Sequence, residues 1–166
     1  MTMEPVQWRP MQGDDLAAVS RIAAVCHPAF PESSRVLAEK QRLAPDFCLV
    51  LADERQVLGY LLAHPWRLGD IPALDHLLGA IPVDADCLYL HDLALLPQTR
   101  GGGYAAKVLA LLERGAMAAG YTKLALVAVN KSAAFWRKQG FIAVQPAGIM
   151  AKKLKTYSDD ALYMTK

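Results

Sequence analysis

Residues 88–106 read LYLHDLALLPQTRGGGYAA and carry more information about fold and function than any other stretch of this 166-residue chain. An apolar, strand-like run stops at Pro97, three glycines (101–103) follow Arg100, and a helical pattern begins near Tyr104. A strand, a tight glycine loop and a helix start present several free backbone N–H groups to one point, at the positive end of the helix dipole. The pattern therefore predicts a main-chain anion site suited to phosphate or pyrophosphate.

Two other phosphate-binding loops do not fit this spacing. A P-loop requires G-x-x-x-x-G-K-[ST], and no Lys-Ser or Lys-Thr pair follows these glycines at that distance. A dinucleotide-binding fingerprint needs a third glycine where this chain has Ala106, and an acidic residue about 20 positions further on. A glycine-rich turn without a ligand is the remaining alternative, although a bare turn rarely needs the entropic cost of three glycines.

Length and composition indicate one well-packed domain over residues 1–166, because 54% of the chain is apolar and 20% is charged. A net charge of +2 gives no indication of nucleic-acid binding, and no apolar stretch has the 18 or more residues of a membrane span. No signal peptide and no metal-ligand spacing are recognisable, so we expect a cytoplasmic protein without a metal. Reduced, buried thiols are expected for the three cysteines, Cys26, Cys48 and Cys87.

The hydrophobic pattern predicts an alternation of strands and helices without an internal repeat. Strands are expected at 6–9, 47–52, 56–64, 88–95, 124–129, 141–144 and 161–165, and helices at 13–25, 33–43, 104–119 and 132–139. Residues 66–86 are rich in Pro, Gly and Asp, and a loop of this length is often functional. The lysine-rich run at 152–155 is interpreted as a solvated face or loop.

A second landmark lies at residues 129–141, VNKSAAFWRKQGF. The spacing Arg100-x-x-Gly103-x-Ala105 resembles the acyl-CoA pyrophosphate loop of the GNAT superfamily of N-acetyltransferases, and the second landmark resembles its N…A..FY…GF segment. The order of elements resembles the whole GNAT domain. The resemblance implies an α/β (α+β) fold with a mixed sheet of six to seven strands, about four helices, and splayed fourth and fifth strands.

The resemblance further implies direct transfer of an acetyl group from acetyl-CoA to a primary amine in a ternary complex. The pantetheine arm would lie along the strand before the loop, where the Leu93 N–H is our candidate oxyanion donor to the thioester carbonyl. A turn role for Asn130 and a core role for Phe135 stay open as alternatives. The residues implied to hold acetyl-CoA are Leu93, Ala94, Leu95, Arg100, Gly101, Gly102, Gly103, Tyr104, Ala105, Asn130 and Phe135.

An alkylamine is protonated near neutral pH, so a base must remove its proton, and His91 is the candidate. Strict alternation would place Tyr89, His91 and Leu93 on one strand face. In arylalkylamine-type members of the superfamily this strand carries histidines, and Tyr89 and His91 fall at the matching positions. A core histidine is the alternative for His91, and Asp92 either orients a neighbour, pairs with a cationic substrate or forms a structural ion pair. Surface or loop roles are expected for the other histidines, His27, His64 and His76.

One position departs from the family pattern. The usual general acid is a tyrosine directly after Phe135, and this chain has Trp136, whose indole N–H cannot supply a proton. Either another phenol, Tyr89 or Tyr104, replaces it, or the domain binds acyl-CoA without transferring the acyl group.

The acceptor pocket is expected between the first two helices and the hairpin strands, with residues 66–86 as a flap. The segment Cys26-His-Pro-Ala-Phe-Pro-Glu resembles the equivalent stretch of arylalkylamine acetyltransferases. The leading hypothesis is a small-molecule amine as acceptor; a protein or peptide acetyltransferase and an acyl-CoA-binding regulatory domain are the alternatives. A homodimer is an expectation of the resemblance alone. Candidate acceptor-binding residues are Phe30, Pro31, Glu32, Trp66, Asp70, Asp75 and Asp92.

Overall fold

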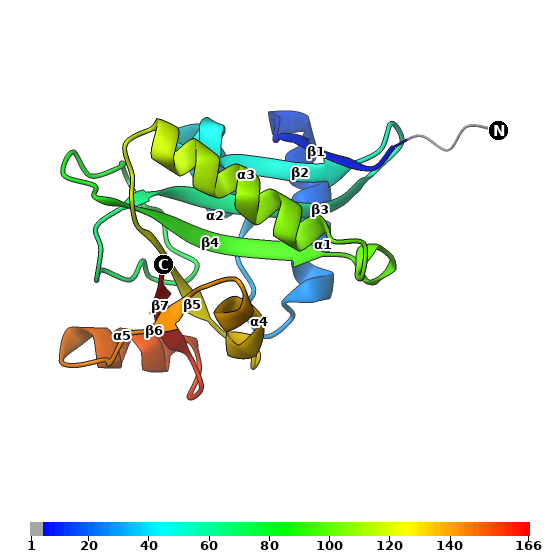
Figure 1. The fold of residues 1–166 in the computed structure, drawn as a ribbon. Helices are drawn as coiled ribbons and strands as arrows, with labels where there is room; N and C mark the ends of the chain where they lie inside the picture. Colours follow the sequence, from blue (N-terminus) through cyan, green and yellow to red (C-terminus); the bar gives the residue numbers. More distant parts are fainter. Residues whose placement is uncertain (1–4) are drawn as a thin grey trace.

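A computed structural model describes residues 5–166, which form a seven-stranded mixed sheet with helices on both faces (Figure 1). The strands follow the order β1-β2-β3-β4-β5-β7-β6. The strands are β1 (Gln7–Pro10), β2 (Cys48–Ala52), β3 (Val57–Trp66), β4 (Cys87–Leu95), β5 (Leu124–Ala128), β6 (Ile142–Ala143) and β7 (Leu162–Thr165). The helices are α1 (Leu16–Cys26), α2 (Ser34–Leu43), α3 (Tyr104–Ala118), α4 (Ala133–Lys138) and α5 (Ile149–Tyr157). Short 3-10 turns occupy Gly13–Asp15, Pro45–Phe47 and Pro97–Thr99.

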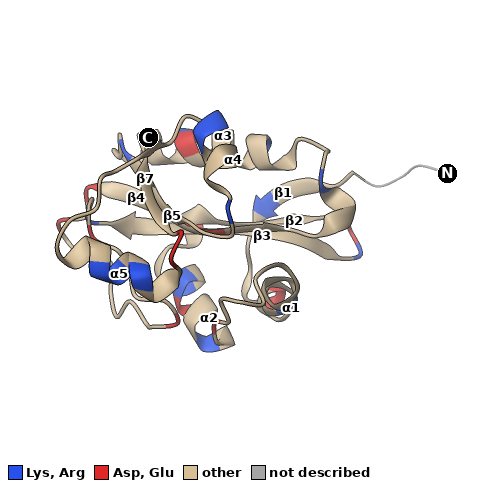
Figure 2. Cartoon of the chain, turned by 90° about the horizontal axis from the view of Figure 1, so that it is seen from below, with Lys and Arg blue, Asp and Glu red and all other residues tan. Residues whose placement is uncertain are grey.

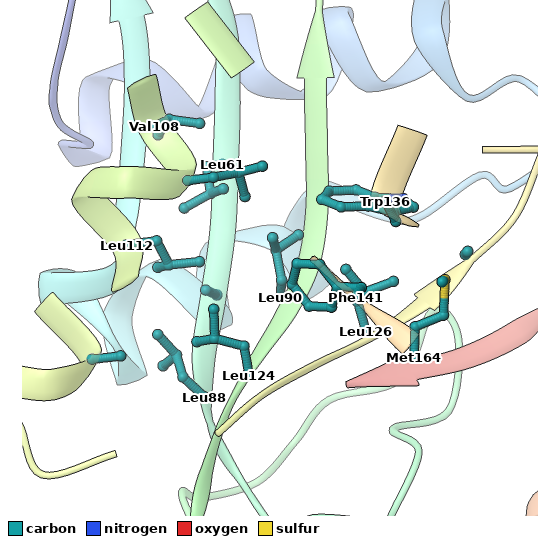
Figure 3. Close-up of a cluster of buried hydrophobic side chains, with 14 residues drawn as sticks. Leu61, Leu88, Leu90, Val108, Leu112, Leu124, Leu126, Trp136, Phe141 and Met164 are labelled. Carbon is teal, nitrogen blue, oxygen red and sulfur yellow. The ribbon is translucent and has the colours of Figure 1, made fainter. Parts of the chain in front are cut away.

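The helices divide between the two faces of the sheet. Seen along the sheet, α3 and α4 cover one face, and α1, α2 and α5 cover the other (Figure 2). On the α3 face, leucines of β3 and β4 pack against Val108 and Leu112 of α3, and Trp136 and Phe141 extend this core towards β5 (Figure 3). The opposite face buries Val19 and Ile22 of α1. The mixed sheet and the GNAT-like order of elements are therefore confirmed.

The helix α5 was not predicted. The structure has five helices where about four were expected, and α5 occupies the lysine-rich run that the sequence suggested was a solvated face or loop. Leu154 is the buried anchor of α5, with 5% of its surface exposed. One fully buried position in nine residues leaves a weak apolar stripe, so the lysines dominated the pattern. Lys152 and Lys155 are exposed and Lys153 is half-buried, and Figure 2 marks the basic residues along α5 in blue.

Strands β4 and β5 run parallel but pair over only three residues. Leu88, Tyr89 and Leu90 of β4 face Leu124, Ala125 and Leu126 of β5, whereas β4 continues to Leu95 alongside β3. The two strands therefore part after Leu90, and the predicted splay is confirmed. The last residues of β4 keep a hydrogen-bonded neighbour on the β3 side only.

A β-bulge interrupts β4 at the same point. Leu62 of β3 pairs with Asp92 and the next residue, Ala63, pairs with Leu90, so His91 is the extra residue. A bulge reverses the alternation of side chains beyond it. Leu90 and Leu93 consequently share the α3 face, whereas Tyr89 and Ala94 pack on the opposite face. The predicted common face for Tyr89, His91 and Leu93 is wrong, because simple alternation assumes an uninterrupted ladder.

No helix among residues 5–166 is long and apolar enough to cross a membrane.

The α3 face should carry much of the stability. Leu112 is 2% exposed within this core, whereas its neighbour Leu111 is 40% exposed. We expect Leu112→Ala to lower the free energy of unfolding by about 2–5 kcal/mol, since it leaves a cavity. Leu111→Ala, the matched control, should change it by about 0.5 kcal/mol or less. Urea denaturation measures both, and equal losses for the two variants would contradict this description of the core.

Candidate active site

The three glycines of the loop before α3 are required for different reasons. Gly101 and Gly103 have φ values of +87° and +78°, in the left-handed region that residues with a Cβ rarely adopt. A Cβ on Gly102 would lie 2.6 Å from the Tyr104 ring. The loop thereby turns tightly and presents its backbone directly at the start of α3.

Five N–H groups at this turn have no backbone acceptor among residues 5–166. The N–H groups of Thr99, Arg100 and Gly102 donate to the carbonyls of Leu96, Pro97 and Thr99, and the five without a backbone acceptor belong to residues 101–106 other than Gly102. The first turn of a helix leaves its N–H groups unpaired, and the helix dipole makes the same point electropositive. The arrangement fits a pyrophosphate in charge and in the number of donors. The unpaired donors are the amides of Gly101, Gly103, Tyr104, Ala105 and Ala106.

A single cavity of about 570 Å³ connects this loop with the parted end of β4. Its middle is lined by the part of β4 that β5 does not cover, including Leu93, Ala94 and Leu95. Its far end is bounded by the connection between α1 and α2, by the segment 67–86 and by α5. The cavity can therefore hold an extended ligand along β4 with a second ligand at its far end.

The second landmark borders the same cavity from the β5 side. Asn130 follows β5 with a φ of +55°, which Asn tolerates better than most residues, and it lines the cavity. Phe135 and Trp136 both line the cavity, but Phe135 is 36% exposed, whereas Trp136 is 8% exposed and its ring lies 5.5 Å, centroid to centroid, from the Phe141 ring. Trp136 is thus the core aromatic of this helix, and Phe135 faces the ligand space.

Residues 16–141 match the sequence model of the acetyltransferase (GNAT) family. The chain belongs to this family. Its members are acyl-CoA-dependent N-acetyltransferases that use acetyl-CoA as co-substrate and need no metal. No group of three or more His, Cys, Asp or Glu side chains within residues 5–166 is placed to hold a metal ion. The predicted family, fold and co-substrate are confirmed.

Solved structures show the same fold at low sequence identity. Ard1 from Thermoplasma volcanium has a TM-score of 0.75 and 14% identity, with 97% of this chain and 96% of that chain covered. The GphF GNAT-like decarboxylase in complex with isobutyryl-CoA has a TM-score of 0.76 and 18% identity, with 96% and 97% covered. Arabidopsis thaliana Naa50 in complex with the bisubstrate analogue CoA-Ac-MVNAL has a TM-score of 0.66 and 16% identity, with 97% of each chain covered. No curated protein matches the chain.

At the far end of the GNAT cavity, His91 is locked into a buried pair with Glu32. His91 Nε2 lies 2.6 Å from Glu32 Oε1, and the two side chains are only 3% and 8% exposed. The other carboxylate oxygen accepts the Asp75 N–H at 3.1 Å. Burial alone would raise the pKa of Glu32, but the hydrogen bond and charge of His91, with the charge of Lys40, bring it below its ordinary value.

A second histidine–carboxylate pair lies beside the first. His27 Nε2 is 2.7 Å from Asp92 Oδ1, and the Tyr60 hydroxyl donates a short hydrogen bond to the other Asp92 oxygen. Burial lowers the pKa of His27, but contact with Asp92, the charge of Glu32 and the Leu93 backbone raise it above its ordinary value overall. His27 lines the cavity, so its expected surface or loop role is wrong.

The remaining histidines divide clearly. His64 is fully buried between Trp66 and Tyr89, and burial lowers its pKa to about 3, so its expected surface or loop role is also wrong. His76 is exposed on the segment 67–86, as expected.

The structure places in the cavity one tyrosine that the sequence analysis did not consider. Tyr157 at the end of α5 lines the cavity and donates to the Pro72 carbonyl at 2.5 Å. Burial raises its pKa to about 12, although a hydrogen bond from Tyr89 opposes the shift. Tyr89 is 1% exposed, and burial raises its pKa well above the ordinary value. Tyr104 lines the loop end of the cavity.

The segment 67–86, the predicted flap, is held to neighbouring elements by side-chain hydrogen bonds, and its Leu74 lines the far end of the cavity. The Glu39 carboxylate accepts the N–H groups of Leu78 and Gly79 at 2.6 and 3.1 Å. Asp70 pairs with Lys153 of α5, and Asp75 accepts the Ser33 N–H. These partners engage both aspartates that were candidates for binding an ammonium group.

Several predicted acceptor residues do meet in the cavity, whereas five predicted site residues are not lining residues: Pro31, Trp66, Asp70, Asp75 and Gly102. Phe30, Glu32 and Asp92 line the cavity together with Leu74 of the flap. Trp66 packs against Tyr89 and Ala125 on the α5 side of the sheet. Leu74 and Tyr157 carried no sequence signal for the site because each joins it through contacts distant in the chain. His27 lies in the segment 26–32 whose resemblance was noted, but its own role was not predicted.

Binding of coenzyme A should depend on the backbone of the loop. We expect Gly103→Ala to weaken the Kd of coenzyme A by about tenfold or more, because alanine disfavours the left-handed conformation that starts α3. Gly120→Ala is the control. Gly120 lies beyond the C-terminal end of α3 with a φ of +91°, so alanine there strains the backbone in the same way but far from the loop. Isothermal titration should show an unchanged Kd for the control; a loss shared by both variants would refute the loop assignment.

The Glu32–His91 pair should stabilise the fold in a pH-dependent way. The lowered pKa of Glu32 means that its stabilisation is present above the unfolded-state pKa, about 4.3, and is lost as the pH falls through the folded-state value. Glu32→Gln should lower the free energy of unfolding on the order of 3 kcal/mol at pH 7, with the deficit shrinking in acid. Denaturation at pH 7 and pH 3 measures this. Glu54→Gln in the exposed β2–β3 turn is the control, and an equal deficit at both pH values would contradict the pairing.

Proposed function

We propose that this GNAT domain transfers the acetyl group of acetyl-CoA to a primary amine of a small molecule by direct attack in a ternary complex. The observation that carries the proposal is the single cavity that runs from the glycine loop along β4 to an end covered by the flap and α5. A volume of about 570 Å³ lies in the usual range for small-ligand pockets, and part of it is needed for the pantetheine arm. The remaining space suits a small acceptor.

The co-substrate end of the cavity supplies main-chain groups in the required order. The free amides from Gly101 to Ala106 would bind the pyrophosphate, with the exposed Arg100 guanidinium at the mouth adding a charge-assisted contact. The backbone of Leu93 to Leu95, unpaired on the β5 side, would pair with the pantetheine arm as an added strand. Asn130 and Phe135 would contact that arm from the other side.

The reacting carbonyl would then lie at the point where β4 leaves β5. A thioester carbonyl beside Leu93 can accept its N–H, and this donor stabilises the negative charge that develops when the amine attacks. Beyond this point the cavity walls are Phe30 and Leu74, which are apolar, and the two histidine–carboxylate pairs. An amine has here both an apolar contact surface and a base within the same space.

The covered far end favours a small acceptor over a peptide. Naa50 was solved with a bisubstrate analogue that contains a peptide, so the fold itself accommodates peptide acceptors. In this chain the flap is hydrogen-bonded to Glu32 and Glu39, and Tyr157 of α5 contacts Pro72 of the flap. An extended peptide would have to break these contacts, whereas a small amine would not.

A thiol-release assay with acetyl-CoA tests the proposal. The acceptor panel contains arylalkylamines, polyamines, free amino acids and peptides with a free N-terminus or lysine. We expect turnover with one or more small amines and a kcat/KM for peptides at least about a hundredfold lower. Omission of the acceptor measures background hydrolysis of the thioester.

Two results would overturn the proposal in different ways. Turnover with peptides alone would make the chain a protein acetyltransferase and would require the flap to open. Tight acetyl-CoA binding with no turnover on any acceptor would favour an acyl-CoA-binding regulatory domain, the alternative that Trp136 raised.

A further inference from the structure

We propose that His27, positioned by Asp92, is the catalytic residue that takes the proton from the attacking amine and returns it to the sulfur of coenzyme A. The inference rests on the proposed function and replaces His91, the sequence-based candidate, as the base. It is carried by the geometry of two adjacent histidine–carboxylate pairs that both border the cavity but differ in how far their imidazole side chains are exposed.

The exposure of the two rings separates their roles. Both histidines line the cavity, but the His27 side chain is 23% exposed and the His91 side chain only 3%. His91 Nε2 is held at 2.6 Å by Glu32, and its Nδ1 is buried without a hydrogen-bond partner among residues 5–166. Neither nitrogen of His91 can accept a proton from the cavity without moving the ring. His91 and Glu32 therefore act as a fixed wall of the acceptor end.

The placement of His27 follows from the end of α1 and the bulge in β4. His27 directly follows α1, and the bulge turns Asp92 towards this face of the sheet, where its carboxylate lies 2.7 Å from His27 Nε2. The Tyr60 hydroxyl holds the second carboxylate oxygen. His27 Nε2 is buried and makes no hydrogen bond among residues 5–166, so Asp92 acts on the ring as an ion-pair partner, and Nδ1 is the nitrogen left for proton transfer. The ring also contacts the backbone of Leu93, the residue proposed to hold the thioester carbonyl.

The charges around His27 suit a group that cycles between two protonation states. Asp92 on β4 and Glu32 on the α1–α2 connection are the carboxylates that act on it, and Cys26 is its neighbour at the end of α1. The Tyr60 phenol lies behind Asp92, and Arg100 is further off, near Cys26. The two carboxylates outweigh the burial of the ring and keep its pKa above the ordinary 6.5.

One residue can serve both proton transfers. The neutral amine nitrogen attacks the thioester carbon and forms the C–N bond, and the N–H proton moves to Nδ1 of neutral His27. The C–S bond then breaks, the sulfur keeps the bonding electron pair, and the imidazolium returns the proton to it. The products are the amide and free coenzyme A, with neutral His27 restored. Because a thiolate of pKa about 8.5 is an adequate leaving group, no tyrosine is needed at position 136.

The test uses the full chain and whichever amine the acceptor panel identifies. We expect His27→Gln to lower kcat by about a hundredfold or more, with the Kd of coenzyme A unchanged within about twofold. Free imidazole should restore part of the activity of His27→Ala. Exposed His76→Gln is the matched control and should retain wild-type kcat. His91→Gln, followed through the pH profile, compares the two candidate bases directly.

The pH profile provides a readout that a purely structural role would not move. The neutral ring is the active form, so kcat should rise with pH through a pKa above 6.5. Asp92→Asn removes the charge that raises this pKa and should shift the rise to lower pH as well as lowering kcat. His27→Gln should abolish the part of the rise that remains once the ionisation of the acceptor amine, with a pKa of about 10, has been allowed for.

The outcomes separate this inference from the proposed function. If the wild type releases no thiol with any amine, the proposed function fails and this inference fails with it. If the wild type is active and His27→Gln keeps its kcat and its pH profile, the inference alone is wrong. If the pH-dependent rise in kcat is lost in His91→Gln but kept in His27→Gln, His91 is the catalytic base. That result would also overturn the inference about His27.

Discussion

The parting of β4 from β5 after Leu90 is the constraint on which the site depends. Three parallel pairs hold the strands together, and beyond them β4 has backbone donors and acceptors on one side with no strand to meet them. Unpaired backbone groups inside a domain are costly unless a ligand or water satisfies them. The split in the sheet therefore creates both the space for an extended co-substrate and the hydrogen-bonding edge that binds it. The glycine loop fixes the register, because it places the helix amides where this edge ends.

Because of the bulge at His91, neighbouring residues of β4 contact groups on opposite faces of the sheet. Leu93 turns towards α3 with Leu90, while His91 and Asp92 meet groups from the α1–α2 connection on the other face. Burying two carboxylates here would be strongly unfavourable for each alone. Each is paired with an imidazole, and Asp92 also accepts from Tyr60. Glu32 additionally accepts from the flap, so closure of the acceptor end and the position of His91 depend on one carboxylate.

The sequence predicted what is encoded locally and missed what depends on pairing between distant segments. The glycine loop, the second landmark and the ends of β4 and α3 follow from contiguous residue types, and all lie where they were expected. The bulge is visible only in the pairing of β4 with β3, so strict alternation gave the wrong face for Leu93. His27 and Asp92 are 65 positions apart, and neither has a local pattern that names the other. The helix α5 was also missed, because lysines dominate its sequence and its apolar stripe is weak. The position of Tyr157, at the end of α5, was therefore missed too.

The replacement of the family's tyrosine by Trp136 has a structural explanation and a chemical consequence. Trp136 packs between Phe135 and Phe141 in the α3-face core, where an indole fills volume that a phenol would leave. A phenol that donates a proton from that side of the sulfur is therefore absent. Tyr89 and Tyr157 do not compensate readily, because they interact with each other and burial raises both pKa values. Tyr104 lines the cavity at its loop end, beside the glycine turn. In the mechanism that we propose, the proton for the sulfur comes instead from the opposite side of β4, where His27 lies 2.7 Å from Asp92 and would pass on the proton of the attacking amine.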